Sequence, residues 1–151
     1  MKKTLLIPLL SIFVLSCSLD NENPYNTIMD STLIAKDDLH GNGAEGIQKQ
    51  NLIISNPVDW NELINKMDSV NNESDYFTET DINFSEDIII AVFDEIKTHA
   101  GHTVELDIRS NSEKIVVYVT STEPQGPAAT VMTQPFHIVK ISKTDLPIRF
   151  E

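Results

Sequence analysis

Cysteine is almost absent from this chain, and basic side chains are few. Cys17 is the only cysteine among 151 residues, so no disulfide can form within the chain and no multi-cysteine metal site can be assembled. The 11 lysines and arginines stand against 23 aspartates and glutamates, which gives a net charge of −12. A surface this acidic argues against binding to nucleic acid and against adhesion to anionic lipid headgroups.

Long apolar runs are also scarce, and the longest one stands at the N-terminus. Residues 5–15 are nearly all apolar, but 11 residues of helix span only about 16 Å of a hydrocarbon core about 30 Å thick. Lys2 and Lys3 precede the run, as in a secretory leader. The run ends in Val14-Leu15-Ser16-Cys17, which resembles a bacterial lipoprotein signal, in which the cysteine is acylated and becomes the first residue.

We therefore expect residues 1–16 to be a lipoprotein signal peptide and Cys17 to carry the lipid that holds the protein at a membrane. The alternative is an ordinary signal peptide that is cut near Cys17. Acidic residues shortly after Cys17 resemble surface-export signals of some Gram-negative lipoproteins, and a plain solvated linker would have the same composition. The expected location is the cell envelope, at the outer membrane of a Gram-negative bacterium, on its periplasmic or its surface face.

The remaining chain divides by composition into a tether and one domain. Residues 17–46 are rich in Asn, Asp, Ser and Gly, and we expect a flexible acidic tether there, with weak pairing to the domain by the short apolar residues 32–35 as the alternative for that piece. Residues 47–151 predict a single α+β domain, mostly antiparallel, with about six strands and one main helix near 57–68. Asn56 and Pro57 open the helix as cap and first residue, and Trp60, Leu63 and Met67 form its apolar stripe.

The expected strands differ in how they are buried. Residues 87–93 are apolar without alternation, which indicates a central strand covered on both faces, with the helix over one of them. Residues 102–109 and 114–120 alternate and are joined by a short polar turn, which predicts a β-hairpin. Residues 48–55 and 136–141 predict two further strands, and residues 147–150 a last strand at a sheet edge.

No motif in the sequence indicates catalysis, and we expect neither a cofactor nor a metal ion. His99 and His102 have a His-x-x-His spacing, but they stand at the start of a strand and no third ligand follows at a usual distance. The chain has no Gly-x-Ser-x-Gly nucleophile turn and no glycine-rich phosphate loop. We therefore interpret the protein as a non-enzyme.

Two loops beside the hairpin have the composition of docking surfaces. In residues 97–102, Gly101 stands directly before an alternating strand, which predicts a positive φ or a close backbone approach there. Residues 123–136 are braced by prolines and uncharged after Glu123. A protein partner is the expected ligand, and inward packing of Met132 and Phe136 is the alternative, favoured for Phe136. The candidate partner-binding residues are Lys97, Gly101, His102, Met132, Gln134 and Pro135.

Several of these segments together resemble the C-terminal domain of the PrcB family of protease-complex subunits. The resembling features are Trp60 and Leu63 of the helix, Lys97 and Gly101 of the turn, and Thr-Gln-Pro-Phe-His-Ile-Val-Lys at residues 133–140. Paired glycines of the family pattern are replaced here by Ala100 and Gly101. The resemblance implies a non-catalytic accessory subunit that assists the assembly or stability of a surface or secreted protease. From the acidic net charge, we expect the chain to be monomeric by itself. A peptidase inhibitor or ligand-binding lipoprotein that presents the same two loops is the alternative.

Overall fold

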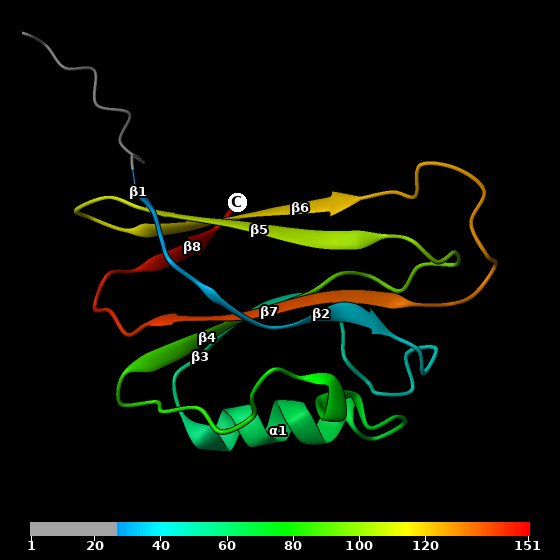
Figure 1. The fold of residues 1–151 in the computed structure, drawn as a ribbon, viewed down its shortest axis with the longest axis horizontal. Coiled ribbons are helices and arrows are strands. Elements are labelled where there is room, and N and C mark those ends of the chain that lie inside the picture. Colours follow the sequence, from blue (N-terminus) through cyan, green and yellow to red (C-terminus); the bar gives the residue numbers. More distant parts are fainter. Residues whose placement is uncertain (1–26) are drawn as a thin grey trace, which may run out of the picture.

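The computed structural model describes residues 27–151 and shows three layers, two β-sheets and a helix (Figure 1). The predicted signal peptide 1–16 and lipid-bearing Cys17 lie outside the described residues. Within residues 27–151, no helix is long and apolar enough to cross a membrane. The predicted class, α+β with mostly antiparallel strands, is confirmed, although the described part has eight strands rather than about six.

The first sheet, which we call sheet A, forms the outer layer away from the helix. Its strands in spatial order are β1 (Thr27–Ile28), β5 (Thr103–Ser110), β6 (Ile115–Thr122) and β8 (Ile148–Phe150). β5 and β6 form the predicted hairpin, with Thr103 opposite Thr122 and Ser110 opposite Ile115. β8 is at the edge as predicted, but it runs parallel to β6. The reason is that β7, which lies between them in sequence, returns the chain through the other sheet to the end at which β6 starts.

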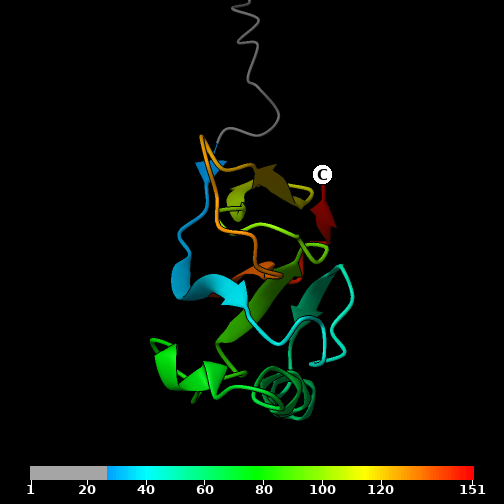
Figure 2. The same ribbon diagram turned by 90° about the vertical axis from the view of Figure 1, so that its right-hand side faces the viewer.

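The second sheet, sheet B, is the middle layer. Its strands in spatial order are β2 (Thr32–Leu39), β7 (Gln134–Ser142), β4 (Asp87–Phe93) and β3 (Gln50–Ile54), all antiparallel to their neighbours. Seen end-on, β3 forms the edge of this sheet on the side away from β2 (Figure 2). The sheet is therefore bounded by β2 on one side and by β3 on the other.

Helix α1 (Pro57–Met67) covers the free face of sheet B (Figures 1 and 2). Asn56 caps the helix, since its side-chain oxygen accepts hydrogen bonds of 3.0 Å from the N–H groups of Val58 and Asp59. The predicted stripe of Trp60, Leu63 and Met67 is buried against the sheet. A short 3₁₀ helix, η1 (Glu73–Tyr76), follows.

β4 is the central strand that its unbroken apolar sequence predicts. Ile89, Ala91 and Phe93 pack in the core between sheet B and α1, whereas the alternate residues Ile88, Ile90 and Val92 pack in the core between the two sheets. Because both faces of β4 are covered, neither face carries a polar side chain within the strand's apolar run.

The prediction that residues 17–46 form a flexible tether is wrong for the described part, residues 27–46. β1 pairs with β5, and β2 pairs with β7 over its whole length, so that Ile34 and Leu39 are at most 1% exposed. The register shifts between Leu33 and Ala35, and this bulge turns two successive residues, Ile34 and Ala35, into the core. The bulge breaks the two-residue alternation by which a strand is recognised in sequence.

Candidate functional site

The two loops predicted as docking surfaces lie side by side at one end of the molecule. Residues 94–102 connect β4 to β5 and residues 123–133 connect β6 to β7. Lys97 and Thr133 exchange backbone hydrogen bonds of 2.7 and 3.0 Å, and Ala100 N–H donates to the carbonyl of Ala129 at 3.0 Å. The loops therefore form one continuous surface, which we call the distal loop surface (residues 94–102 and 123–133; Figure 1).

Two features favour glycine at position 101, where the two loops meet. Its φ of +88° is in the left-handed region that residues with a side chain rarely adopt. A Cβ atom at this position would also lie 3.0 Å from Cβ of Pro124, so a side chain would press against the opposite loop. Sequence reasoning placed a positive φ or a close approach at Gly101, and the structure contains both.

A buried carboxylate supports the base of the distal loop surface. Asp94 is 2% exposed, and its Oδ1 lies 2.8 Å from Nζ of Lys49 and accepts from the N–H of Glu95 at 2.8 Å. Nζ of Lys97 lies 3.1 Å from the other oxygen of Asp94 and 2.9 Å from Glu95. Burial alone would raise the pKa of Asp94, but these cationic and N–H partners hold it well below its ordinary value.

The same ion pairs change the role predicted for Lys97. Its side chain is only 16% exposed. Burial would lower its pKa, but the carboxylates of Glu95 and Asp94 outweigh that effect and raise it. Lys97 therefore stays charged and fixes the loop to the end of β4, rather than projecting freely toward a partner.

Gln134 and Pro135 are not available to a partner, which corrects their assignment as docking residues. Gln134 is 1% exposed, and its amide Nε2 donates to the carbonyls of Ile47 (3.1 Å) and Asp94 (2.8 Å). Pro135 is buried beside it, and its carbonyl accepts from Asp94 N–H at 2.9 Å. Phe136 also packs inward, as favoured from the sequence, and stacks on Phe93 with ring centroids 5.9 Å apart.

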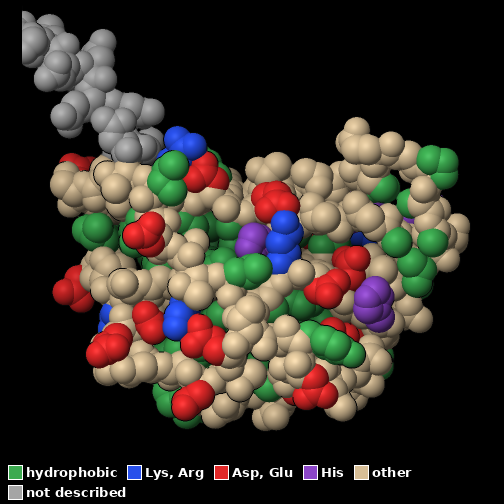
Figure 3. Space-filling view, in the orientation of Figure 1, with side chains coloured by type: hydrophobic (Ala, Val, Ile, Leu, Met, Phe, Trp, Pro, Cys, Tyr) green, Lys and Arg blue, Asp and Glu red, His purple; other side chains and the backbone are tan. Residues whose placement is uncertain are grey.

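Apolar side chains remain exposed on the distal loop surface. Val131 and Met132 are 41% and 42% exposed, and Ile96 is 39% exposed. Hydrophobic side chains gather at the loop end on the right of Figure 3, while carboxylates are spread over the rest of that face. Gly101 is exposed and His102 is half-buried on the same surface, so Gly101 and Met132 are the predicted docking residues that are exposed to solvent.

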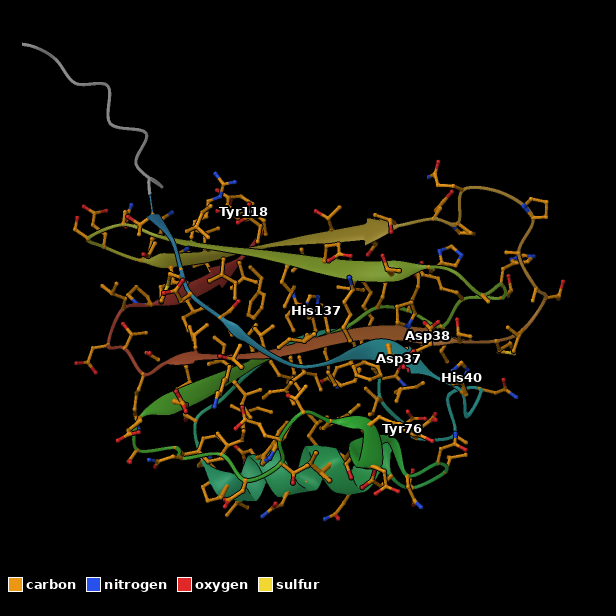
Figure 4. The ribbon with its side chains drawn as sticks, viewed as in Figure 1. Asp37, Asp38, His40, Tyr76, Tyr118 and His137 are labelled. Atoms are coloured by element: carbon orange, nitrogen blue, oxygen red, sulfur yellow. The ribbon has the colours of Figure 1, made fainter. Side chains whose placement is uncertain are left out.

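An acidic hollow that sequence reasoning missed lies next to the distal loop surface. A cavity of about 360 Å³ is lined by Asp37, His40, Asn71, Glu73 and Tyr76. Asp37 and Asp38 at the end of β2 lie near His40, with Tyr76 below them (Figure 4). Burial raises the pKa of both Asp38 and Glu73 against the opposing charge of His40, and Asp37 adds to the rise.

The geometry of these carboxylates does not make a metal centre. Among residues 27–151, no group of three or more His, Cys, Asp or Glu side chains is arranged to hold a metal ion. His99 is exposed and its Nδ1 lies 3.0 Å from Oγ1 of Thr98, so its nearest polar neighbour is a hydroxyl of its own loop. The available signal for the acidic hollow was the pair Asp37-Asp38, which was interpreted as tether composition because β2 was not recognised.

A comparison with protein-family profiles, with curated proteins and with solved structures found no match for this chain. The resemblance to the PrcB family therefore rests on the sequence segments quoted above.

Proposed function

We propose that the protein is a non-catalytic, lipid-anchored interaction module whose distal loop surface binds a protein partner. One observation carries this proposal: two loops from different connections are hydrogen-bonded into a single surface with exposed Ile96, Val131 and Met132, in a chain whose net charge is −12. Apolar side chains presented on a rigid support are typical of the centre of a protein interface, from which charged residues are depleted.

The support beneath the surface favours docking with little rearrangement. Backbone hydrogen bonds join the two loops, the Asp94–Lys97 pair ties one loop to β4, and Gln134 ties the end of the other to residues 47 and 94. A surface that is already ordered loses less conformational entropy when a partner binds. The accessory-subunit role, with a surface or secreted protease as the partner, comes from the sequence resemblance and is part of the proposal.

The test is recovery of the partner from native membranes after mild crosslinking. We expect one protein to be recovered in near-equal amount with the unmodified chain, and at least tenfold less of it with the double variant Val131→Asp/Met132→Asp. Val58→Asp is the matched control, because Val58 is 72% exposed on the first turn of α1, away from the loops. Equal recovery with the loop variant and the control would contradict the proposal.

The identity of what is recovered separates the protease-subunit role from its alternative. An endogenous protease whose yield falls when this chain is absent supports the accessory subunit. Inhibition of added proteases by the purified chain, lost in the loop variant, supports the peptidase inhibitor instead.

A further inference from the structure

The edge of sheet B formed by β3 is open, and its hydrogen-bonding groups can be assigned. Asp94 N–H donates to the carbonyl of Pro135, so this pair is a hydrogen-bonded one in the ladder between β4 and β7. Hydrogen bonding alternates along an antiparallel ladder, so the backbone N–H and C=O groups of Val92 and Ile90 also point toward β7. The backbone groups of Phe93, Ala91 and Ile89 point toward β3. Their partners on β3 are Gln50, Leu52 and Ile54.

The backbone N–H and C=O groups of Asn51 and Ile53 therefore point away from β4, toward the open side of β3. β3 ends the order of sheet B, and no strand of residues 27–151 pairs with this side. Ile53 is 45% exposed. Natural edge strands are usually protected by charges, prolines or bulges, but Gln50–Ile54 contains none of these.

Each face of β3 borders a cavity. Between the two sheets, a cavity of about 270 Å³ lies beside β3 and β8, with Asn51, Val119 and Phe150 in its wall. Between β3 and α1, a second cavity of about 210 Å³ is lined by Leu52, Leu63 and neighbouring residues. Side chains of a strand added to β3 would point alternately into these two cavities, because neighbouring strands share the alternation of their faces.

The charges around the cavities indicate a basic rather than an acidic occupant. In the inter-sheet cavity Nζ of Lys49 lies 2.8 Å from Asp94, so the carboxylate of Glu151 is the charge in excess. The cavity beside α1 has one lysine, Lys66, with the carboxylates of Asp59 and Glu62.

We propose that β3 accepts an extended segment of another protein as a fifth strand of sheet B. The segment has a lysine or arginine opposite Asn51, directed into the inter-sheet cavity toward Glu151, and an apolar side chain opposite Leu52, directed into the cavity beside α1. A second copy of this chain is disfavoured as the occupant, because two chains with a net charge of −12 repel each other. Asp94 lines the inter-sheet cavity and also stands at the base of the distal loop surface, but this proposal does not depend on the function of that surface.

The test uses a synthetic ten-residue peptide of alternating threonine and valine with one arginine among the threonine positions. We expect it to bind the chain, and to bind at least tenfold more tightly than the same peptide with glutamate in place of arginine. Binding should protect the amides of Asn51 and Ile53 from hydrogen exchange, since these are the outward donors. A peptide methylated on the alternate backbone nitrogens that would face β3 should lose binding at least tenfold, because it can no longer donate hydrogen bonds to β3.

A variant of the protein provides the complementary control. Ile53→Pro removes an outward N–H without removing a bond to β4, and proline is tolerated at such edge positions, so binding should fall at least tenfold. Ile53→Val keeps the N–H and should bind within twofold of the unmodified chain. Absence of peptide binding, or binding without amide protection, would overturn the proposal. Protected amides in a dimer of the free protein would overturn it in favour of a second copy.

Discussion

At the scale of single residues, His137 is a titratable group buried between the two sheets. It lies on β7, is 8% exposed, and its Nδ1 lies 2.9 Å from the carbonyl of Val104 on β5 (Figure 4). Burial lowers the pKa of His137; the bond to Val104 and the charge of Glu105 oppose this effect, and the charge of Lys36 adds to it. The folded protein thus favours the neutral imidazole, which donates one hydrogen bond across the sandwich.

This lowered pKa predicts a loss of stability in mild acid. The unfolded chain takes up a proton on His137 near the ordinary pKa of about 6.5, before the folded protein does. The contribution of His137 to the free energy of unfolding is therefore complete above that pH, and it is lost as the pH falls through the pKa of His137 in the folded protein. In urea titrations at pH 7 and pH 5, His137→Gln should lose less free energy of unfolding than the unmodified chain, since glutamine donates without titrating. An equal loss in both proteins would contradict this assignment.

At this scale, sequence reasoning succeeded where a residue's own conformation or polarity decided its place. Gly101 was assigned to a special backbone position, and Phe136 to the core. Gln134 was misassigned, because a glutamine is usually exposed and its burial depends on the carbonyls of Ile47 and Asp94, which are far from it in sequence.

At the scale of elements, β2 determines where the folded domain begins. It covers β7 along one whole side and adds Ile34 and Leu39 to the core beneath α1. A chain that starts at residue 47, where sequence reasoning placed the domain, would expose the hydrogen-bonding edge of β7 and part of that core. We expect residues 47–151 to fail to fold cooperatively, whereas residues 27–151 should give one cooperative thermal transition by circular dichroism.

A matched comparison separates the loss of β2 from the loss of residues as such. A chain that starts at residue 31 lacks the two-residue strand β1 and Met29, whose N–H donates to the carbonyl of Ile108 at 2.9 Å, but it keeps all of β2. It should unfold cooperatively at a lower temperature than residues 27–151. If residues 47–151 unfolded with the same transition as residues 27–151, β2 would be an accessory strand and the tether would extend to residue 46.

The elements that could be predicted are those whose signals are local. The cap Asn56 and the stripe of α1 stand within twelve residues, and the β5–β6 hairpin needs only one short turn. β2 and the parallel pairing of β8 with β6 depend on partners distant in sequence, and β2 also carries the bulge between Leu33 and Ala35. The open edge at β3 could not be predicted from the sequence either, because which strand lies at an edge depends on the order of all strands in the sheet.

At the scale of the whole molecule, the described chain begins at the end of sheet A opposite the distal loop surface. Thr27 pairs with Ser110 at the turn of the β5–β6 hairpin, whereas Thr103 and Thr122 lead into the loops (Figure 1). The seven steps from Thr103 to Ser110 along β5 separate these two ends by about 23 Å at about 3.3 Å per residue. A lipid on Cys17 would therefore tether the domain by the hairpin-turn end and leave the distal loop surface farther from the bilayer.

This arrangement predicts the order of distances from the membrane in the lipidated protein. If Cys17 is acylated as proposed, it has no free thiol, and a single dye can be attached through Ser112→Cys at the hairpin turn or through Met132→Cys on the distal loop surface. In vesicles that contain a lipid-linked acceptor, energy transfer should be more efficient from position 112 than from position 132. The difference should vanish in a chain whose Cys17 is replaced by serine, because that chain would stay in solution. More efficient transfer from position 132 would mean that the distal loop surface faces the lipid, and the proposed protein partner would then have to bind elsewhere.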